Sequence, residues 1–307
     1  MRTAQKILTV IGPTGVGKTK FVVKLAKFVN GEIISADSRQ VYKHLNIGTA
    51  KPTSEELNGI PIHLIDIVLP DENYSCGQFA RDAERKIEEV KKRERVPIIC
   101  GGTGLYIKAL FEPLHILPQS DKRIKEILNN ILKEKGISFL YQRLLEVDPH
   151  WARSIKPNDR QRIMRGLEVY EITGKPLSSI IKNQKPPPKF QPFYIGLLIP
   201  REELYKKIDA RFDQMIQTGL VDEVKGILDM GYDPACPGLK TIGYKEIVDY
   251  ILGNCSLPDA IRKAKQHTRN LAKRQITWFS KILGVKWYKP DVVDLIPQIL
   301  QEYQISR

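Results

Sequence analysis

The stretch that most constrains this chain is residues 12–19, Gly-Pro-Thr-Gly-Val-Gly-Lys-Thr, which has the spacing G-x-x-x-x-G-K-T. An apolar run at residues 7–11 precedes it, and a segment with helical periodicity at residues 20–28 follows it. Between a strand and a helix, such glycines let backbone N–H groups converge on an anion, the lysine reaches its outer oxygens, and the threonine hydroxyl can ligate Mg²⁺. The sequence therefore predicts a phosphate-binding loop (P-loop) made of Gly12, Pro13, Thr14, Gly15, Val16, Gly17, Lys18 and Thr19, with Thr19 as the metal ligand.

The first 112 residues alternate between strand and helix patterns. We expect strands at residues 7–11, 32–36 and 96–100, and helices at residues 20–28, 79–93 and 103–111. This order predicts a parallel sheet covered by helices, whose ligands bind beyond the carboxyl ends of the strands. The loops 12–19, 37–42 and 101–106 each follow a strand, so we expect them to gather at one edge of the sheet.

From residue 113 the pattern changes to amphipathic helices, at residues 121–135, 138–146 and 158–173, the last with Asn158 as its N-cap. Three consecutive prolines within residues 184–190 predict a stiff linker, and residues 194–199 read as a strand that returns to the sheet. Helices are expected at residues 202–218, 221–230, 241–252 and 258–283. We therefore predict an α/β fold, with a P-loop-containing parallel sheet flanked by helices in residues 1–118 and 189–307. A helical insertion domain would occupy residues 119–188.

Composition limits the class of protein. The chain has 307 residues, of which 42% are hydrophobic. Its longest apolar runs fall short of the roughly 20 residues that a membrane-spanning helix needs, and the first expected strand leaves no room for a signal peptide. The four cysteines are scattered without a C-x-x-C pair, which is typical of reduced thiols in a cytoplasmic protein.

The formal net charge of +14 is unevenly distributed. Residues 259–289 contain nine basic residues and one acidic residue, and Arg262, Lys265, Arg269 and Lys273 recur at helical spacing. A well-solvated surface accounts for such an excess in many proteins. Here the basic stripe lies beside an apolar one, which favours a helix that packs on a core and faces a polyanion.

Two of the loops carry candidate catalytic side chains. Asp37 ends the second strand, where it could be either a carboxylate that helps to hold Mg²⁺, as in nucleotide hydrolases, or a general base. Thr103 lies in Gly-Gly-Thr-Gly-Leu-Tyr at residues 101–106, where it would present a hydroxyl at the end of the third strand. A plain tight turn at the start of a helix explains this second loop equally well.

Other segments combine charge with amide or aromatic side chains. Residues 158–165, Asn-Asp-Arg-Gln-Arg-Ile-Met-Arg, suit phosphate and base contacts, although a solvated helix face is an equal alternative. Residues 240–245 and 274–279 interleave basic side chains with Tyr and Trp, which could serve the backbone and the bases of an unpaired strand. Trp278 and Phe279 could instead belong to a core.

Together these segments resemble one family, the tRNA dimethylallyltransferases (tRNA isopentenyltransferases) of bacterial type. The resemblance covers nearly the whole chain and rests on GPTGVGKT at 12–19, ISADSRQVY at 34–42, IGTAKP at 47–52, HLIDI at 63–67, GGTGLY at 101–106, NDRQRIMRGLEVYEITGKPLS at 158–178, RFDQMIQTGLVDEV at 211–224, TIGYKE at 241–246 and KRQITWF at 273–279. Ile62 stands where the family often has a histidine, and Gly166 where it usually has an alanine. Neither departure touches the chemistry.

The resemblance implies transfer of a dimethylallyl group from dimethylallyl diphosphate to the exocyclic amine of an adenosine. This adenosine lies 3′ to the anticodon in tRNAs that read codons beginning with U. The P-loop would hold the diphosphate leaving group with Mg²⁺, and Lys18 and Arg211 would neutralise its charge. Asp37 is our candidate for the base that takes the proton of the amine, and Thr103 would orient the reacting groups. The expected tRNA contacts, with the insertion domain clasping the anticodon stem-loop, are Asp37, Ser38, Arg39, Gln40, Thr103, Gln161, Arg162, Ile163, Met164, Arg165, Lys240, Tyr244, Arg274 and Gln275.

Three other readings remain open at this point. The chain could be an adenylate isopentenyltransferase that acts on free AMP, ADP or ATP, although such an enzyme needs neither the basic insertion nor the aromatic–basic segments. It could be a P-loop kinase of a small metabolite. A non-catalytic RNA-binding module would leave the three strand-end loops without a purpose. We expect a monomer, because one anticodon arm needs one clasp.

Overall fold

The structure is a computed structural model that describes residues 5–112, 115, 117–182 and 188–305. The chain divides into two compact units, one made of Met1–Glu112 with Pro188–Arg307 and the other of Pro113–Pro187. For comparison, the sequence pattern placed the insertion at residues 119–188. Within the described ranges no helix is both long and apolar enough to cross a membrane.

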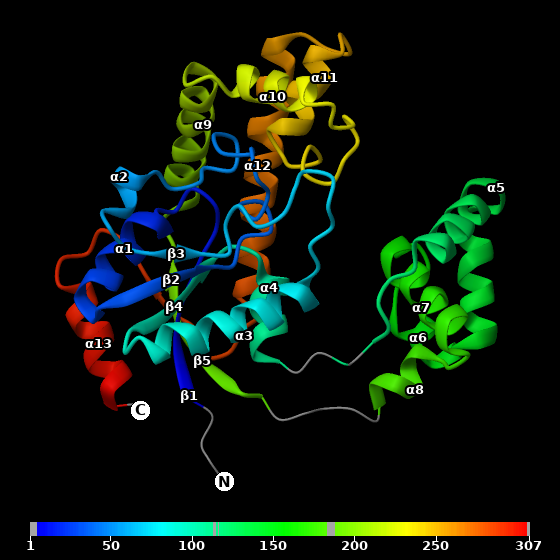
Figure 1. Ribbon diagram of the computed structural model, residues 1–307, viewed down its shortest axis with the longest axis horizontal. Helices are drawn as coiled ribbons and strands as arrows, with labels where there is room; N and C mark the ends of the chain where they lie inside the picture. The colour runs from blue at the N-terminus through cyan, green and yellow to red at the C-terminus, as the bar shows by residue number, and fades with distance from the viewer. Residues whose placement is uncertain (1–4, 113–114, 116, 183–187, 306–307) are drawn as a thin grey trace. The chain divides into compact units, whose positions relative to one another are not determined.

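A parallel sheet organises the larger unit (Figure 1). Its strands lie in the order β3 (Ile62–His63), β2 (Gly31–Ser35), β4 (Val96–Gly101), β1 (Gln5–Ile11), β5 (Phe190–Leu197) and β6 (Lys286–Tyr288). In the middle of the sheet, Leu8 pairs with Ile98 on one side and with Phe193 on the other. Parallel neighbours require crossover connections, and the strand order confirms the predicted α/β fold.

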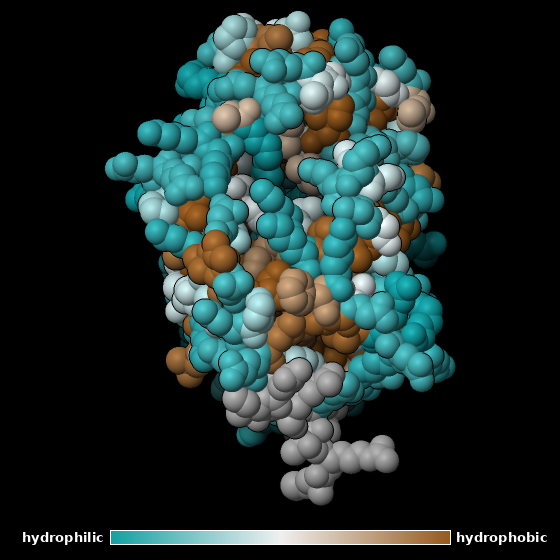
Figure 2. Space-filling model, turned by 90° about the vertical axis from the view of Figure 1, so that its left-hand side faces the viewer, coloured by the Kyte–Doolittle hydropathy of each residue, from teal (hydrophilic) through white to brown (hydrophobic). Residues whose placement is uncertain are grey.

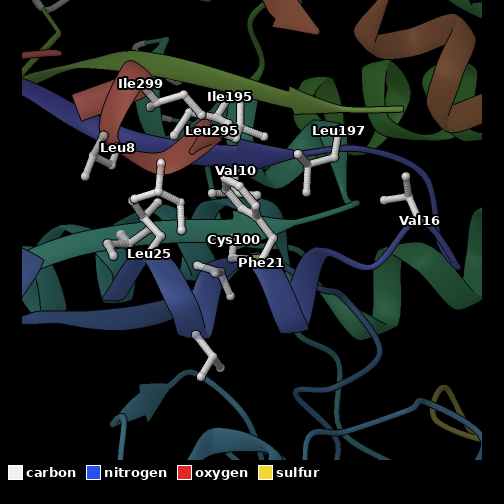
Figure 3. Close-up of a cluster of buried hydrophobic side chains, with 14 of the residues drawn as sticks. Leu8, Val10, Val16, Phe21, Leu25, Cys100, Ile195, Leu197, Leu295 and Ile299 are labelled. Carbon is white, nitrogen blue, oxygen red and sulfur yellow. The ribbon is translucent and has the colours of Figure 1, made fainter. Parts of the chain in front are cut away.

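Alternate side chains of β1 enter two hydrophobic cores, because successive residues of a strand point to opposite faces. Leu8 and Val10 pack with α1 (Lys18–Val29) and α13 (Leu295–Ile305), as Figure 3 shows. Ile7 and Ile11 pack on the other face with α3 (Cys76–Lys92) and α4 (Gly104–Phe111). Both faces of the sheet are therefore covered, which leaves its carboxyl edge for ligands.

A third core joins the C-terminal helices to the loop that follows β2. It contains residues of α9 (Arg201–Gln217), α10 (Leu220–Asp229), α11 (Tyr244–Ile251) and α12 (Leu257–Phe279), together with Val41, Tyr42 and Leu45. The short helix α2 (Ser54–Leu57) lies in the same connection between β2 and β3. On the face of the molecule in Figure 2, hydrophilic side chains predominate and hydrophobic ones are exposed in small groups, as is usual for a folded chain in water.

The smaller unit is helical and has its own core. Its helices are α5 (Lys122–Val147), α6 (Pro149–Ser154), α7 (Arg160–Thr173) and α8 (Leu177–Lys182). Gly136, with φ +78°, kinks α5 at the boundary between the two helices that the sequence pattern separated. The expected N-cap at Asn158 is wrong by one residue, because the carboxylate of Asp159 accepts the hydrogen bond from the backbone N–H of Arg162 at 3.2 Å.

Six short or terminal elements escaped the sequence analysis, namely the strands β3 and β6 and the helices α2, α6, α8 and α13. The two strands are too short to show a period, and residues 286–305 continue past the last helix that we expected. The linker expected at residues 184–190 lies mostly outside the described residues, and Phe190 already belongs to β5.

Candidate active site

The P-loop joins β1 to α1 at the carboxyl edge of the sheet. Gly15 and Gly17 have φ angles of +83° and +99°, and a Cβ on Gly12 would lie 2.6 Å from the carbonyl oxygen of Leu197. Gly17 caps α1 without any side-chain hydrogen bond. The first backbone N–H groups of α1 are therefore free of a side-chain cap and point to where an anion can bind.

Lys18 lies within this loop with its ammonium turned back on the backbone. Its Nζ donates hydrogen bonds to the carbonyl oxygens of Gly12 and Pro13, both at 2.9 Å. Burial lowers the pKa of Lys18 to about 8, against the opposing influence of Cys100 and Asp37. A bound dianion would stabilise the charged ammonium and raise this pKa again.

Arg211 reaches the same loop from α9. Its guanidinium donates a 2.7 Å hydrogen bond to Oγ1 of Thr14. Burial lowers the pKa of Arg211 and the negative charge of Asp37 opposes that effect, but a guanidinium stays protonated in proteins. Two cations from distant parts of the sequence thus meet at one phosphate-binding loop.

Asp37 and Thr103 lie at the ends of the neighbouring strands β2 and β4. Oδ1 of Asp37 accepts hydrogen bonds from the backbone N–H groups of Arg39 at 2.8 Å and Gln40 at 3.4 Å. Within the described part of the chain, no hydrogen bond occupies Oδ2. The hydroxyl of Thr103 accepts from the backbone N–H of Ser38 at 3.0 Å and donates to the Ser38 hydroxyl at 3.3 Å. A carboxylate and a hydroxyl are thereby held side by side.

Gln275 of α12 connects the P-loop to the glycine loop after β4. Its carbonyl oxygen accepts from the backbone N–H of Thr14 at 2.8 Å, and its amide nitrogen donates to the carbonyl oxygen of Gly102 at 2.9 Å. A Cβ on Gly102 would lie 2.4 Å from that nitrogen. We expected Gln275 to contact tRNA, but both ends of its amide are used inside the protein, so its structural role is to hold two loops of the site together.

Gln40 is similarly engaged. Its amide nitrogen donates to the carbonyl oxygens of Thr49 and Ala50 at 3.3 and 3.0 Å, and its oxygen accepts from the Ser35 hydroxyl at 3.1 Å. Arg39, by contrast, is exposed. Of the polar side chains in the loop after Asp37, Arg39 and not Gln40 is therefore free to reach a ligand.

Tyr244 corrects one expectation from the sequence. It is fully buried in the third core, so its ring offers no surface for a base to stack on. Its hydroxyl accepts from the backbone N–H of Gly48 at 3.1 Å and donates to the carboxylate of Glu223. Glu223 also accepts from the backbone N–H of Ile47 at 2.9 Å. The pair supports the loop at residues 46–51, and nothing in the sequence distinguished Glu223 from an ordinary acid on a helix surface.

The basic stripe of α12 is another correction. Lys265 pairs with Asp213 at 2.6 Å, Arg269 pairs with Asp209 at 2.6 Å, and Arg262 pairs with an acid of its own helix at 2.9 Å. These cations hold α12 against α9 or cap its first turns, and they are not free for a polyanion. Lys273 and Arg274, further along α12, are exposed and form no ion pair with any described residue.

The predicted tRNA residues of the smaller unit differ in their exposure. Gln161 and Arg162 are exposed and Met164 is half-buried, but Ile163 is fully buried in the core of this unit and cannot contact a ligand. Arg165 donates to the carboxylate of Glu168 at 2.7 Å and to the carbonyl oxygen of Pro118 at 2.6 Å. Its guanidinium thus serves the internal structure of the unit. Lys240, in the larger unit, is exposed.

Comparison with known proteins gives consistent results. A family model described as IPP transferase matches residues 40–282. A curated tRNA dimethylallyltransferase from Caldanaerobacter subterraneus subsp. tengcongensis is 45% identical over 292 residues, which cover 94% of this chain and 93% of the relative. One from Thermoanaerobacter sp. (strain X514) is 46% identical over the same shares of both chains.

Solved structures agree with these matches. The tRNA isopentenylpyrophosphate transferase of Bacillus halodurans superposes with a TM-score of 0.71 and 38% identity, over 99% of this chain and 96% of that protein. A eukaryotic dimethylallyltransferase acting on tRNA superposes with a TM-score of 0.81 and 30% identity, over 98% of this chain and 78% of that protein. With a P-loop, a strand-end carboxylate and these relatives, the chain belongs to the IPP transferase family.

Proposed function

We propose that this chain transfers the dimethylallyl group of dimethylallyl diphosphate to the exocyclic amine of the adenosine 3′ to the anticodon, in tRNAs that read codons beginning with U. One observation carries the proposal within the larger unit. The P-loop cations Lys18 and Arg211 lie at the same sheet edge as Asp37 and Thr103, and Gln275 connects the two halves. The half with Lys18 and Arg211 suits an anionic leaving group, and the half with Asp37 and Thr103 suits an amine that must lose a proton.

The reaction forms a bond between the amine nitrogen and C1 of the donor and breaks the bond between C1 and the diphosphate oxygen. Negative charge grows on that oxygen as the bond breaks. Lys18, Arg211 and the backbone N–H groups at the start of α1 stabilise this charge more in the transition state than in the ground state.

The adenine amine is a weak nucleophile, because its lone pair is delocalised into the ring. The free Oδ2 of Asp37 accepts the proton as the new bond forms, a contribution of about 10²–10⁴ in rate. The hydroxyl of Thr103, held by Ser38 at 3.0 Å, orients the amine or the departing oxygen.

The residues of the loop fit a divalent metal, although no three acidic, histidine or cysteine side chains cluster in the described ranges. Mg²⁺ in such sites takes most of its ligands from substrate phosphates and water, with few from the protein. The Thr19 hydroxyl, which forms no hydrogen bond with a described residue, is our candidate ligand. A bound Mg²⁺ supplies further positive charge to the diphosphate.

The exposed residues among our tRNA candidates carry the recognition part of the proposal. They are Arg39 near the site, Lys240 and Arg274 in the C-terminal helical region, and Gln161 and Arg162 in the smaller unit, with the half-buried Ser38 beside Arg39. The target adenosine leaves the stack of the anticodon loop to reach Asp37, and an unpaired loop base costs less to extrude than a paired one. A tRNA substrate would place the reaction in the cytoplasm, and a monomer remains our expectation.

One assay separates this function from its alternatives. The protein is incubated with labelled dimethylallyl diphosphate and either unmodified tRNA or free AMP, and ATP consumption is followed separately. We expect label in the anticodon-loop nucleoside by mass spectrometry. Label in AMP alone would indicate an adenylate isopentenyltransferase, and ATP consumption without label transfer would indicate a kinase.

Asp37→Ala tests the assignment of the base. We expect turnover to fall by about 10²–10⁴ while tRNA affinity changes no more than a few-fold. Asp71→Ala, which removes an exposed carboxylate outside the site, is the matched control. Wild-type turnover in Asp37→Ala would remove this residue from the mechanism.

A further inference from the structure

Two cavities flank the C-terminal half of α12. The first, of about 970 Å³, lies between α12, α4 and β5 and includes Trp278 and Arg274 in its lining. The second, of about 580 Å³, lies between α12, the segment after β5, and β6. Lys273 and Thr277 line both cavities, so the two meet across one turn of α12. The second cavity has no role in the chemistry described above.

The second cavity is positively charged. Arg201, Lys273 and Lys289 line it, all three are exposed, and no acidic residue lines it. None of the three forms an ion pair with a described residue. This contrasts with the N-terminal half of α12, where Lys265 and Arg269 are neutralised by acids of α9. Of the stripe formed by Arg262, Lys265, Arg269 and Lys273, only Lys273 is thus without an acidic partner among the described residues.

Aromatic rings line the same cavity. Tyr205, Trp287 and Tyr288 contribute to its wall beside the apolar side chain of Ile276. The guanidinium of Arg201 lies 5.1 Å from the centre of the Tyr205 ring and donates to the Tyr205 hydroxyl at 2.9 Å. Rings for stacking with cations around them are the combination that binds an unpaired nucleotide, one part for the base and the other for its phosphates.

The position of the cavity connects it with the catalytic loops. Trp278 packs on the glycine loop that carries Thr103, since a Cβ on Gly104 would lie 2.2 Å from the indole nitrogen. From Trp278, Thr277 and Lys273 lead around α12 into the second cavity. An RNA strand that leaves the catalytic loops along this surface passes Lys273 and Arg274, which form no ion pair with a described residue.

We propose that the second cavity binds an unpaired nucleotide of the tRNA anticodon loop, with its base against Tyr205 and Tyr288 and its phosphate between Lys273 and Lys289. The proposal rests on the proposed function, since it assumes a tRNA substrate. The cavity would be a second point of attachment for the anticodon loop, on the side of α12 away from Trp278. The RNA next to the flipped adenosine would then be anchored as well as the adenosine itself.

Lys289→Glu tests the proposal in the full chain. We expect the KM for tRNA to rise roughly tenfold, because one charge-assisted contact is lost, while the KM for dimethylallyl diphosphate stays unchanged. The slope of log affinity for tRNA against log salt should fall by about 0.7, the value for one phosphate contact on a single strand. Lys289→Arg should restore both quantities. Lys24→Glu, the same change on an exposed lysine of α1 that forms no ion pair with a described residue, is the control and should behave as wild type.

Two results would overturn the inference. One is a Lys289→Glu variant whose tRNA parameters match those of Lys24→Glu. The other is a rise in the KM for the donor alone, which would mean that this residue acts through the neighbouring P-loop, since Pro290 would lie 3.8 Å from a Cβ on Gly17.

If the variant fails to fold, photocrosslinking the wild-type chain to an anticodon stem-loop that carries 4-thiouridine replaces it. Crosslinks within residues 198–205 or 286–289 support the proposal, and crosslinks confined to other peptides contradict it. Failure of the proposed function itself is distinguishable, since the wild-type chain would then not prenylate tRNA at all.

Discussion

The binding of the donor should depend on pH through Lys18. Burial lowers the pKa of this lysine from its ordinary value of 10.5 to about 8 in the absence of a ligand. Only the charged ammonium attracts a diphosphate, and a bound diphosphate raises the pKa again. Above pH 8, binding must therefore take up a proton, so the affinity for the donor falls as the pH rises.

The size of the change in donor affinity follows from the fraction of Lys18 that is charged. With a pKa of about 8, this fraction is about 0.9 at pH 7 and about 0.1 at pH 9, so the apparent Kd should rise about tenfold between them. The neighbours of Lys18 do not obscure this titration. Burial raises the pKa of Cys100 to about 12, and Arg211 remains protonated throughout. The diphosphate of the donor does not obscure it either, because the last ionisation of a phosphate ester has a pKa of about 6, below the pH range of the experiment.

The assay is calorimetric titration of dimethylallyl diphosphate into the protein at intervals between pH 7 and pH 9.5. Lys18→Arg is the control, since its guanidinium does not titrate in this range; it should bind more weakly but with a flat profile. A wild-type affinity that stays constant up to pH 9.5 would refute the argument that Lys18 is desolvated in the free protein and is the cation on which donor binding depends.

Three further predictions concern residues that support the site or the fold. Gln275→Ala removes the two hydrogen bonds by which this side chain connects the P-loop to the glycine loop. We expect a loss of about 2 kcal/mol in the free energy of unfolding, measured by urea titration, and a raised KM for the donor. An unchanged KM would show that the connection through Gln275 does not shape the site. Tyr244→Phe leaves a backbone N–H and Glu223 without their hydroxyl partner, which should cost about 1–3 kcal/mol in the same titration, whereas a variant as stable as wild type would show that water replaces the hydroxyl. The hydrogen bond with Arg93 is the main reason why the pKa of Glu32 is lowered in the folded protein. The contribution of Glu32 to the free energy of unfolding is therefore complete above its unfolded pKa of about 4.5 and is lost as the pH falls through the lower folded pKa. Glu32→Gln should make the free energy of unfolding decline less steeply at acid pH, and an identical decline in both proteins would contradict this.

Much of the fold could be predicted because its elements have periodic local patterns. The strand, loop and helix around Lys18 could be predicted from the sequence, because glycine spacing and apolar runs are patterns of a few neighbouring residues. The sequence patterns missed the short helices α2, α6 and α8 and the terminal helix α13. They also missed the two- and three-residue strands β3 and β6, whose existence depends on a partner strand already in place. Local patterns could not show them.

The candidate site divides in the same way. Lys18, Asp37 and Thr103 could be named from loops that follow strands, because parallel topology brings strand ends together. The tasks of Gln275 and Tyr244 could not, since their hydrogen-bond partners lie 173 to 261 residues away for Gln275 and 196 residues away for the Tyr244–Gly48 contact. Local segments suggested that Gln275 and Tyr244 contact RNA, and the structure uses both side chains in contacts within the protein.

By itself the sequence determined that this chain has a P-loop on a parallel α/β sheet and a helical insertion, because backbone geometry and apolar periodicity are local properties. Only the tertiary structure decided which cations remain free. The charges of α12 look alike in sequence, yet the acids of α9 neutralise Lys265 and Arg269, whereas Lys273 has no ion pair with any residue that the structure describes. The physical reason is that the charge a ligand meets depends on which opposite charges pack within a few ångströms, and that depends on how distant helices meet.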